Sequence, residues 1–198
     1  MSDKTRTLVE IGMLGAIATV LMLFEFPLPF IAPPFYEIDL SEVPVLVGAF
    51  ALGPAAGATI EFIKILINLL INGTATAFVG EIGNYILGCS FIIPAALIYK
   101  KKKSKKNALI GMIVGTITLT VFGCFLNAYV LLPTYAAAFG MPIDAIIGMG
   151  TAINPSIDNI MTFVVIAVAP FNIIKGIAVS AVTMLIYKHI SPILKGNR

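Results

Sequence analysis

The sequence predicts an all-α integral membrane protein, a bundle of six transmembrane helices with both termini in the cytoplasm. Of its 198 residues, 59% are hydrophobic and 12% are charged, whereas soluble domains average about 25% charged residues. Residues 65–79 and 109–143 contain no charged side chain. Cations cluster at the start of the chain, in residues 100–106 and at its end. Such clusters favour the cytoplasmic side of a membrane, which places all three segments there.

Residues 1–198 form a single membrane domain in this prediction. The expected helices are 7–27, 42–53, 54–72, 78–99, 107–132 and 170–187. The helix at 42–53 is short for a full span, but an even number of crossings must separate the first cationic cluster from the second, so it is counted. Pro133 and Pro170 bound the last two spans. The intervening residues 134–169 are expected to be an outer segment, in which 160–169 forms a re-entrant or interfacial helix.

Residues 28–41 connect the first two helices in a Pro-rich, aromatic loop. Pro27, Pro29, Pro33 and Pro34 rule out a regular helix here. A long loop that carries aromatic and acidic side chains favours a lid over a binding site, although aromatic anchoring at the membrane interface remains an open alternative. Ser41 is a plausible N-cap of the next helix.

The polar residues of the predicted spans gather near the outer surface. At about 1.5 Å per residue, Asn127, Asn172 and Lys175 lie within the outer half of their helices, as do Glu81 and Asn84. The inner ends of the last three spans are apolar, which indicates an outward-opening pocket above a packed plug. Charges at membrane depth mark functional sites by default.

Two charged residues, Glu61 and Lys64, lie deeper in the third helix. Their i, i+3 spacing lets them form an ion pair, and a pocket or coupling role remains open. No catalytic constellation is visible: His189 lies near the cytoplasmic end, and Cys89 and Cys124 lack metal-ligand spacing. The sequence therefore indicates neither an enzyme nor a metal site.

The chemistry of the predicted pocket favours a flat heteroaromatic ligand. An amide offers an acceptor and two donors, and a lysine offers donors only, which suits a ring edge with alternating carbonyl and N–H groups. Aromatic side chains could cover the ring faces: Phe30, Phe35, Tyr36 and Tyr129. The cations are too few for a polyphosphate.

At this point the chain resembles a known family, the S components (substrate-binding membrane subunits) of energy-coupling factor (ECF) vitamin transporters, and most closely the riboflavin-specific ones. The resemblance spans nearly the whole chain. Its marks are residues 36–44 (YEIDLSEVP), 53–57 (GPAAG), 80–84 (GEIGN) and 170–176 (PFNIIKG). The last of these, together with Asn127, points to the flavin-specific branch.

The resemblance implies a membrane subunit without catalytic activity or a cofactor. Its partners would be a transmembrane T component and two cytoplasmic ATPases, and its surroundings lipid rather than nucleic acid. By this resemblance, Asn127, Asn172 and Lys175 hydrogen-bond the isoalloxazine edge, and the loop around Asp39 and Leu40 covers the site. A small-residue face of the first helix docks on the T component, here Gly12, Gly15, Ala16 and Thr19; packing within the subunit is the alternative.

The implied function is high-affinity capture of riboflavin at the outer face of a bacterial cell membrane for ATP-driven uptake. Acceptance of flavin mononucleotide (FMN) stays open. The chain has no Gly-x-x-x-x-Gly-Lys-[Ser/Thr] phosphate loop, in agreement with a need for ATPase partners. The alternatives are an S component for another vitamin or heterocycle, and a small secondary transporter.

Overall fold

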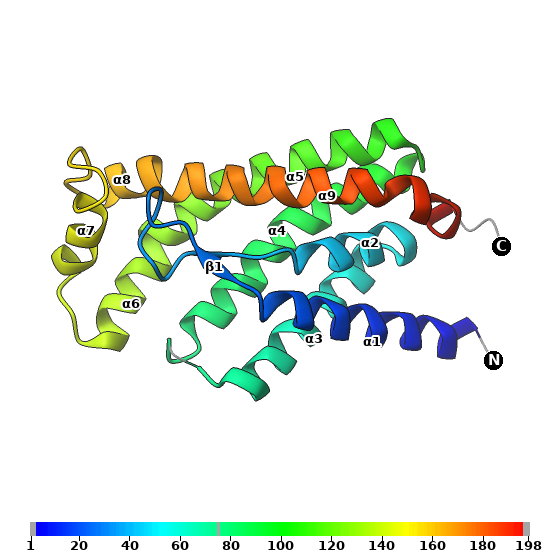
Figure 1. Ribbon diagram of the computed structural model, residues 1–198, viewed down its shortest axis with the longest axis horizontal. Coiled ribbons are helices and arrows are strands. Elements are labelled where there is room, and N and C mark those ends of the chain that lie inside the picture. Colours follow the sequence, from blue (N-terminus) through cyan, green and yellow to red (C-terminus); the bar gives the residue numbers. More distant parts are fainter. Residues whose placement is uncertain (1–2, 75, 196–198) are drawn as a thin grey trace.

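The computed structural model describes residues 3–74 and 76–195, which fold into an elongated helical bundle (Figure 1). Two very short strands form a hairpin between the first two helices. The helices are α1 (Asp3–Met22), α2 (Glu42–Leu52), α3 (Pro54–Asn72), α4 (Val79–Lys101), α5 (Lys105–Leu126), α6 (Leu132–Phe139), α7 (Ile143–Thr151), α8 (Ile160–Phe163) and α9 (Ala169–Lys195). The strands are β1 (Phe26–Pro27) and β2 (Glu37–Ile38), and two π-helical turns are η1 (Asn127–Leu131) and η2 (Val164–Val168).

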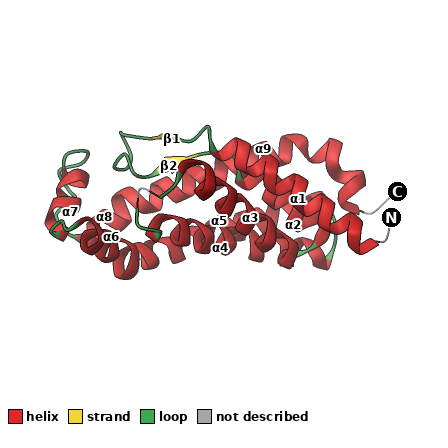
Figure 2. Cartoon of the chain, turned by 90° about the horizontal axis from the view of Figure 1, so that it is seen from below, coloured by secondary structure: helices red, strands yellow, loops and turns green. Residues whose placement is uncertain are grey.

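Both chain termini and the α4–α5 turn lie at one end of the bundle in Figure 1, where the sequence predicted the cytoplasmic side. The hairpin loop and α7 lie toward the opposite end, and Figure 2 shows the same arrangement from below. The described residues contain five helical segments long and apolar enough to cross a membrane, besides the shorter α2. The predicted all-helical membrane class is thus confirmed.

Two proline predictions differ from the structure. Pro133 and Pro170 were expected to end the fifth span and begin the sixth, but helical segments run through both, over Lys105–Phe139 and Ile160–Tyr187. Each proline is the second residue after the end of a π turn. Proline lacks an N–H and clashes with the carbonyl of residue i−4, and the π turn shifts the local hydrogen-bond register, which removes that conflict.

This difference changes the outer segment. Residues 160–169 form no separate re-entrant helix, because α8 and η2 continue directly into α9. The irregular outer segment shrinks from the expected 134–169 to 140–159, with α7 within it. The final candidate membrane span is therefore longer than predicted, at 28 residues from Ile160 to Tyr187, and the helix itself continues to Lys195.

The first three helices are arranged around two chain breaks. α1 ends at Met22 rather than near residue 27, because Phe26 and Pro27 pair with Ile38 and Glu37 in the hairpin. Gly53 separates α2 from α3 with a φ of 104°, a conformation that glycine adopts readily. The 11 residues of α2 rise only about 16 Å, about half the hydrocarbon thickness.

The described residues form two hydrophobic clusters. The larger lies among α1, α2, α3, α4, α5 and α9 and includes Leu46, Phe91, Tyr99 and Met112. The smaller joins the hairpin loop to the α6–α9 region, and its members include Ile38 and Phe163. The larger cluster forms the predicted apolar plug. The smaller cluster packs the hairpin loop against the α6–α9 region.

Candidate functional site

A cavity of about 300 Å³ lies beneath the loop that joins α1 to α2. We call residues 23–41 the lid. Volumes of this size are within the range of small-molecule sites. Side chains from the lid, from α2 to α4, and from the η1 and α9 regions line it. Its polar and charged lining residues are Glu25, Tyr36, Glu37, Asp39, Glu42, Asn68, Asn72, Thr76, Glu81, Asn84, Asn127, Tyr135, Asn172 and Lys175.

Two buried amides, those of Asn127 and Asn172, line the cavity. Asn172 is 4% exposed, and its Nδ2 has no hydrogen-bond partner among the described residues. A Cβ on Gly123 would lie 2.5 Å from that nitrogen, so only a glycine leaves room for the amide. Asn127 begins the π turn, and its Nδ2 donates to the Gly123 carbonyl at 2.8 Å. The Tyr36 hydroxyl donates to Asn127 Oδ1 at 2.6 Å.

The lid is also tied to the wall by an ion pair. Lys175 Nζ lies 3.3 Å from Asp39 Oδ2, and the Ser41 backbone N–H donates to Asp39 Oδ1 at 2.6 Å. Burial alone would raise the pKa of the Asp39 carboxyl, but the nearby Lys175 and Lys64 ammonium groups and the Ser41 hydrogen bonds outweigh it and lower the pKa to about 2. Asp39 is therefore ionised throughout the physiological range.

The lid side of the cavity is acidic. Glu25, Glu37 and Asp39 all line it from the lid. Burial, followed by repulsion from the Glu37 and Asp39 carboxylates, raises the pKa of Glu25 to about 7. The charge of Glu25 therefore changes near neutral pH.

The remaining predicted site residues separate into two groups. Glu81 and Asn84 line the cavity from α4, and Glu81 Oε2 accepts a hydrogen bond from the Thr76 hydroxyl at 2.8 Å. Leu40 is 37% exposed and is not among the described lining residues. The lid that carries Leu40 lies over the cavity through its neighbours Tyr36, Glu37 and Asp39, and ligand contact by Leu40 stays a prediction.

Aromatic rings cover part of the cavity. Tyr36 packs against Phe171, with ring centroids 5.5 Å apart, and against Phe35 at 4.8 Å. Phe30 and Tyr129, which were expected to join them, are exposed and are not among the described lining residues. Sequence reasoning assigned no lining role to Phe171, although it lies beside Asn172 in the motif that indicated the site.

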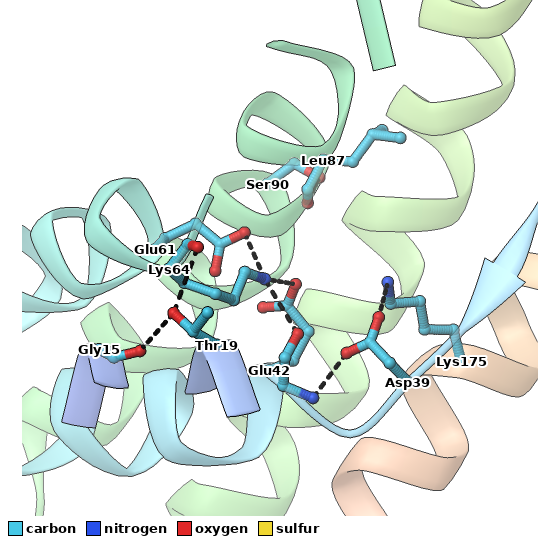
Figure 3. Close-up of polar contacts among 10 residues, drawn as sticks. Gly15, Thr19, Asp39, Glu42, Glu61, Lys64, Leu87, Ser90 and Lys175 are labelled. Atoms are coloured by element: carbon cyan, nitrogen blue, oxygen red, sulfur yellow. Dashed lines mark hydrogen bonds and ion pairs between the residues drawn. The ribbon is translucent and has the colours of Figure 1, made fainter. Parts of the chain in front are cut away.

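A buried charge network lies next to the cavity (Figure 3). Lys64 Nζ is 2.8 Å from Glu61 Oε1, which confirms the predicted i, i+3 pair, and 3.0 Å from Glu42 Oε1. It also donates to Ser41 Oγ at 3.1 Å. Ser41 is the N-cap of α2 as predicted, but its hydroxyl makes no cap hydrogen bond. The hydroxyl oxygen accepts the hydrogen bond from Lys64 instead. Nothing in the sequence pointed to the contact between Glu42 and Lys64, except that a buried charge needs a partner.

The predicted docking face of α1 is only partly confirmed as accessible. Gly12 and Ala16 are exposed, and nothing lies within 4 Å of a Cβ built on Gly12. Gly15 is buried against Ile63 of α3, and the Thr19 hydroxyl is buried against the Lys64 carbonyl. Gly15 and Thr19 pack within the subunit, so they are unavailable to a partner.

Comparison with known proteins agrees with this architecture. The family described as "ECF transporter, substrate-specific component" matches residues 6–187. The riboflavin transporter RibU of Staphylococcus aureus (strain TCH60) is 38% identical over 98% of this chain and 94% of its own length. The riboflavin transporter FmnP of Bacillus subtilis (strain 168) is 35% identical over 98% of this chain and 97% of its own.

A solved structure of the S component of a bacterial ECF transporter superimposes with a TM-score of 0.76 at 37% sequence identity, covering 98% of this chain and 99% of that one. Family, relatives and fold agree over nearly the full length. The chain therefore belongs to the family of substrate-specific S components of ECF transporters, multi-pass plasma-membrane proteins of bacteria that bind a transported substrate and are not enzymes.

Proposed function

We propose that this S component binds riboflavin at the outer face of the membrane for uptake. The observation that carries the proposal is the Asn172 amide nitrogen, buried at the cavity wall without a hydrogen-bond partner among the described residues. A buried donor left unpaired costs about 1–3 kcal/mol, and rotation of the Asn172 amide toward the cavity that this residue lines would let a ligand acceptor recover that cost. The relatives named as riboflavin transporters support flavin as that ligand.

The cavity offers complementary groups for each part of riboflavin. Asn172 and Lys175 supply donors for the carbonyl edge of the isoalloxazine ring, and Asn127 supplies an amide whose acceptor is held by Tyr36 until the ligand enters. The rings of Tyr36 and Phe171 cover the flat faces. Asp39, Glu81 and Asn84 supply acceptors for hydroxyl groups.

Transport would require the partners of the family. We infer a T component that docks on the exposed Gly12 and Ala16 face of α1, and two cytoplasmic ATPases that drive reorientation of the loaded subunit and release of riboflavin inside. The exposed small residues permit close helix approach. The cationic α4–α5 turn and the termini share one end of the bundle, which is the cytoplasmic end by the positive-inside tendency.

The absorption spectrum of protein purified from rich medium tests the ligand class. Flavin bands that survive washing, together with quenching of added riboflavin fluorescence, are the expected result. A colourless protein that leaves riboflavin fluorescence unchanged would reject riboflavin and favour another heterocycle. The same titration with FMN measures whether a phosphate is accepted beside the acidic lid side of the cavity.

Orientation is tested separately. An epitope tag inserted at Gly73, in the α3–α4 turn, should be accessible to antibody on intact cells. Accessibility only after permeabilisation would place this turn in the cytoplasm and overturn the proposed outward opening of the cavity.

A further inference from the structure

The chain is attached to one residue of α3 both before the lid, in the last turns of α1, and where the lid ends. At the end of α1, the Thr19 hydroxyl donates to the Lys64 carbonyl at 3.3 Å and to the Gly15 carbonyl at 2.9 Å. At the start of α2, Lys64 Nζ contacts Ser41 Oγ at 3.1 Å and Glu42 Oε1 at 3.0 Å. The backbone of Lys64 therefore holds the chain entering the lid, and its side chain holds the chain leaving it (Figure 3).

This anchor is connected to the cavity wall through the lid. Ser41 contacts Lys64 with its hydroxyl and Asp39 with its backbone N–H, and Asp39 pairs with Lys175 of α9. An unbroken polar chain thus runs from α3 through the end of the lid to α9. Ser41 therefore links Lys64 to the Asp39–Lys175 pair.

Burial of this network points to positioning rather than to stability alone. Lys64 and Glu61 are 0% exposed and Glu42 is 3% exposed. Taking charges out of water costs about as much as their pairing returns, and apolar residues of similar volume are often equally stable. A buried ion network gives directional contacts, in contrast to apolar packing, and here those contacts converge on the two lid ends.

We propose that Lys64 is the positioning residue of the lid, fixing both lid ends so that Asp39 and Tyr36 reach Lys175 and Asn127 over the ligand. Holding the two ends at one point lowers the entropy that the lid loses on closing. Loss of either contact opens the lid more often, and bound ligand escapes faster. The inference rests on the proposed function only for the identity of that ligand.

The test removes the hydroxyl contacts and leaves the ion pairs in place, so that the fold is preserved. Thr19→Val removes the contact at the α1 end, and Ser41→Ala removes the hydroxyl contact at the α2 end, where the Lys64–Glu42 ion pair remains. Thr19→Ser retains the hydroxyl and should restore the behaviour of the unmutated protein. Thr59→Val on α3 is the matched control, because Thr59 is exposed and, within the described part of the chain, its hydroxyl bonds to the Ala55 carbonyl of its own helix.

The first measurement needs no ligand. A nitroxide label at Phe30→Cys in the exposed lid reports lid mobility by electron paramagnetic resonance, with Cys89 and Cys124 replaced by serine. A second label at Leu70→Cys, on the exposed face of α3, reports loosening of the bundle. Thr19→Val and Ser41→Ala should each increase mobility at Phe30 and leave Leu70 unchanged.

The second measurement is the dissociation rate of riboflavin, followed by recovery of its fluorescence. Thr19→Val and Ser41→Ala should each release riboflavin about fivefold faster, which is the effect of one lost hydrogen bond. The change in association rate should be smaller.

Unchanged lid mobility in both variants, or equal loosening at Phe30 and Leu70, would overturn the positioning role. Failure of the unmutated protein to bind riboflavin would instead overturn the proposed ligand, while the mobility measurement would still decide the role of Lys64.

Discussion

Replacement of Lys175 by methionine separates two roles of this residue in the proposed site. Lys175 both faces the cavity and pairs with Asp39 of the lid at 3.3 Å, with side-chain exposures of 13% and 2%. Methionine retains most of the apolar stem and removes the charge. We expect Lys175→Met to weaken riboflavin binding while the protein remains folded in detergent.

The expected magnitude follows from the geometry of the pair. Breaking a fully buried ion pair by removing one partner costs about 3–5 kcal/mol. Lys175 retains some solvent contact, and Asp39 retains the Ser41 N–H, so the loss should approach that of one charged hydrogen bond, about 1.5–3 kcal/mol. That loss corresponds to a Kd raised about 10- to 150-fold.

The assay is quenching of riboflavin fluorescence by purified protein, with Lys100→Met at the opposite end of the bundle as the matched control. A double-mutant cycle with Asp39→Asn then assigns the effect. If Lys175 contacts the ligand, Lys175→Met still weakens binding at least about tenfold in the Asp39→Asn background. If it only holds the lid, the double variant equals the single ones. Unchanged affinity of Lys175→Met would remove this residue from the site.

Three further predictions concern other parts of the molecule. The pKa of Glu25 rises from 4.5 to about 7 under the closed lid, so the stabilisation of the closed lid by protonated Glu25 is complete below pH 4.5 and is lost as pH rises through 7. Riboflavin should therefore dissociate faster at about pH 8 than at pH 6, by at most about tenfold. Glu25→Gln should abolish this pH dependence in stopped-flow measurements. Gly88→Ala should lower the free energy of unfolding by about 1–3 kcal/mol, because the new Cβ would lie 2.7 Å from Glu61 Cδ. Gly148→Ala is the control, because nothing lies within 4 Å of a Cβ at that position. Equal unfolding temperatures of the two variants would contradict this packing. Gly12→Leu should leave riboflavin binding intact and block copurification with the T component, and a complex that still assembles would exclude this face of α1 as the docking surface.

Local spacing accounts for what the sequence predicted well. Composition placed the chain in the membrane, and helical geometry related residues of one helix, such as Glu61 with Lys64 and Asn172 with Lys175. These relations follow from 3.6 residues per turn and need no tertiary information. Depth counting brought the polar side chains of α4, η1 and α9 to one level, where the cavity lies.

The sequence by itself determined the membrane class, the order of the helices and the level of the pocket, whereas only the tertiary structure decided which distant residues meet. Glu42 pairs with Lys64 across 22 positions, Tyr36 bonds Asn127 across 91, and Lys175 bonds Asp39 across 136. A membrane helix is apolar on every side, so its hydropathy does not reveal which face turns inward. That rotation is set by packing against neighbouring helices, which is why α1 exposes Gly12 but buries Thr19.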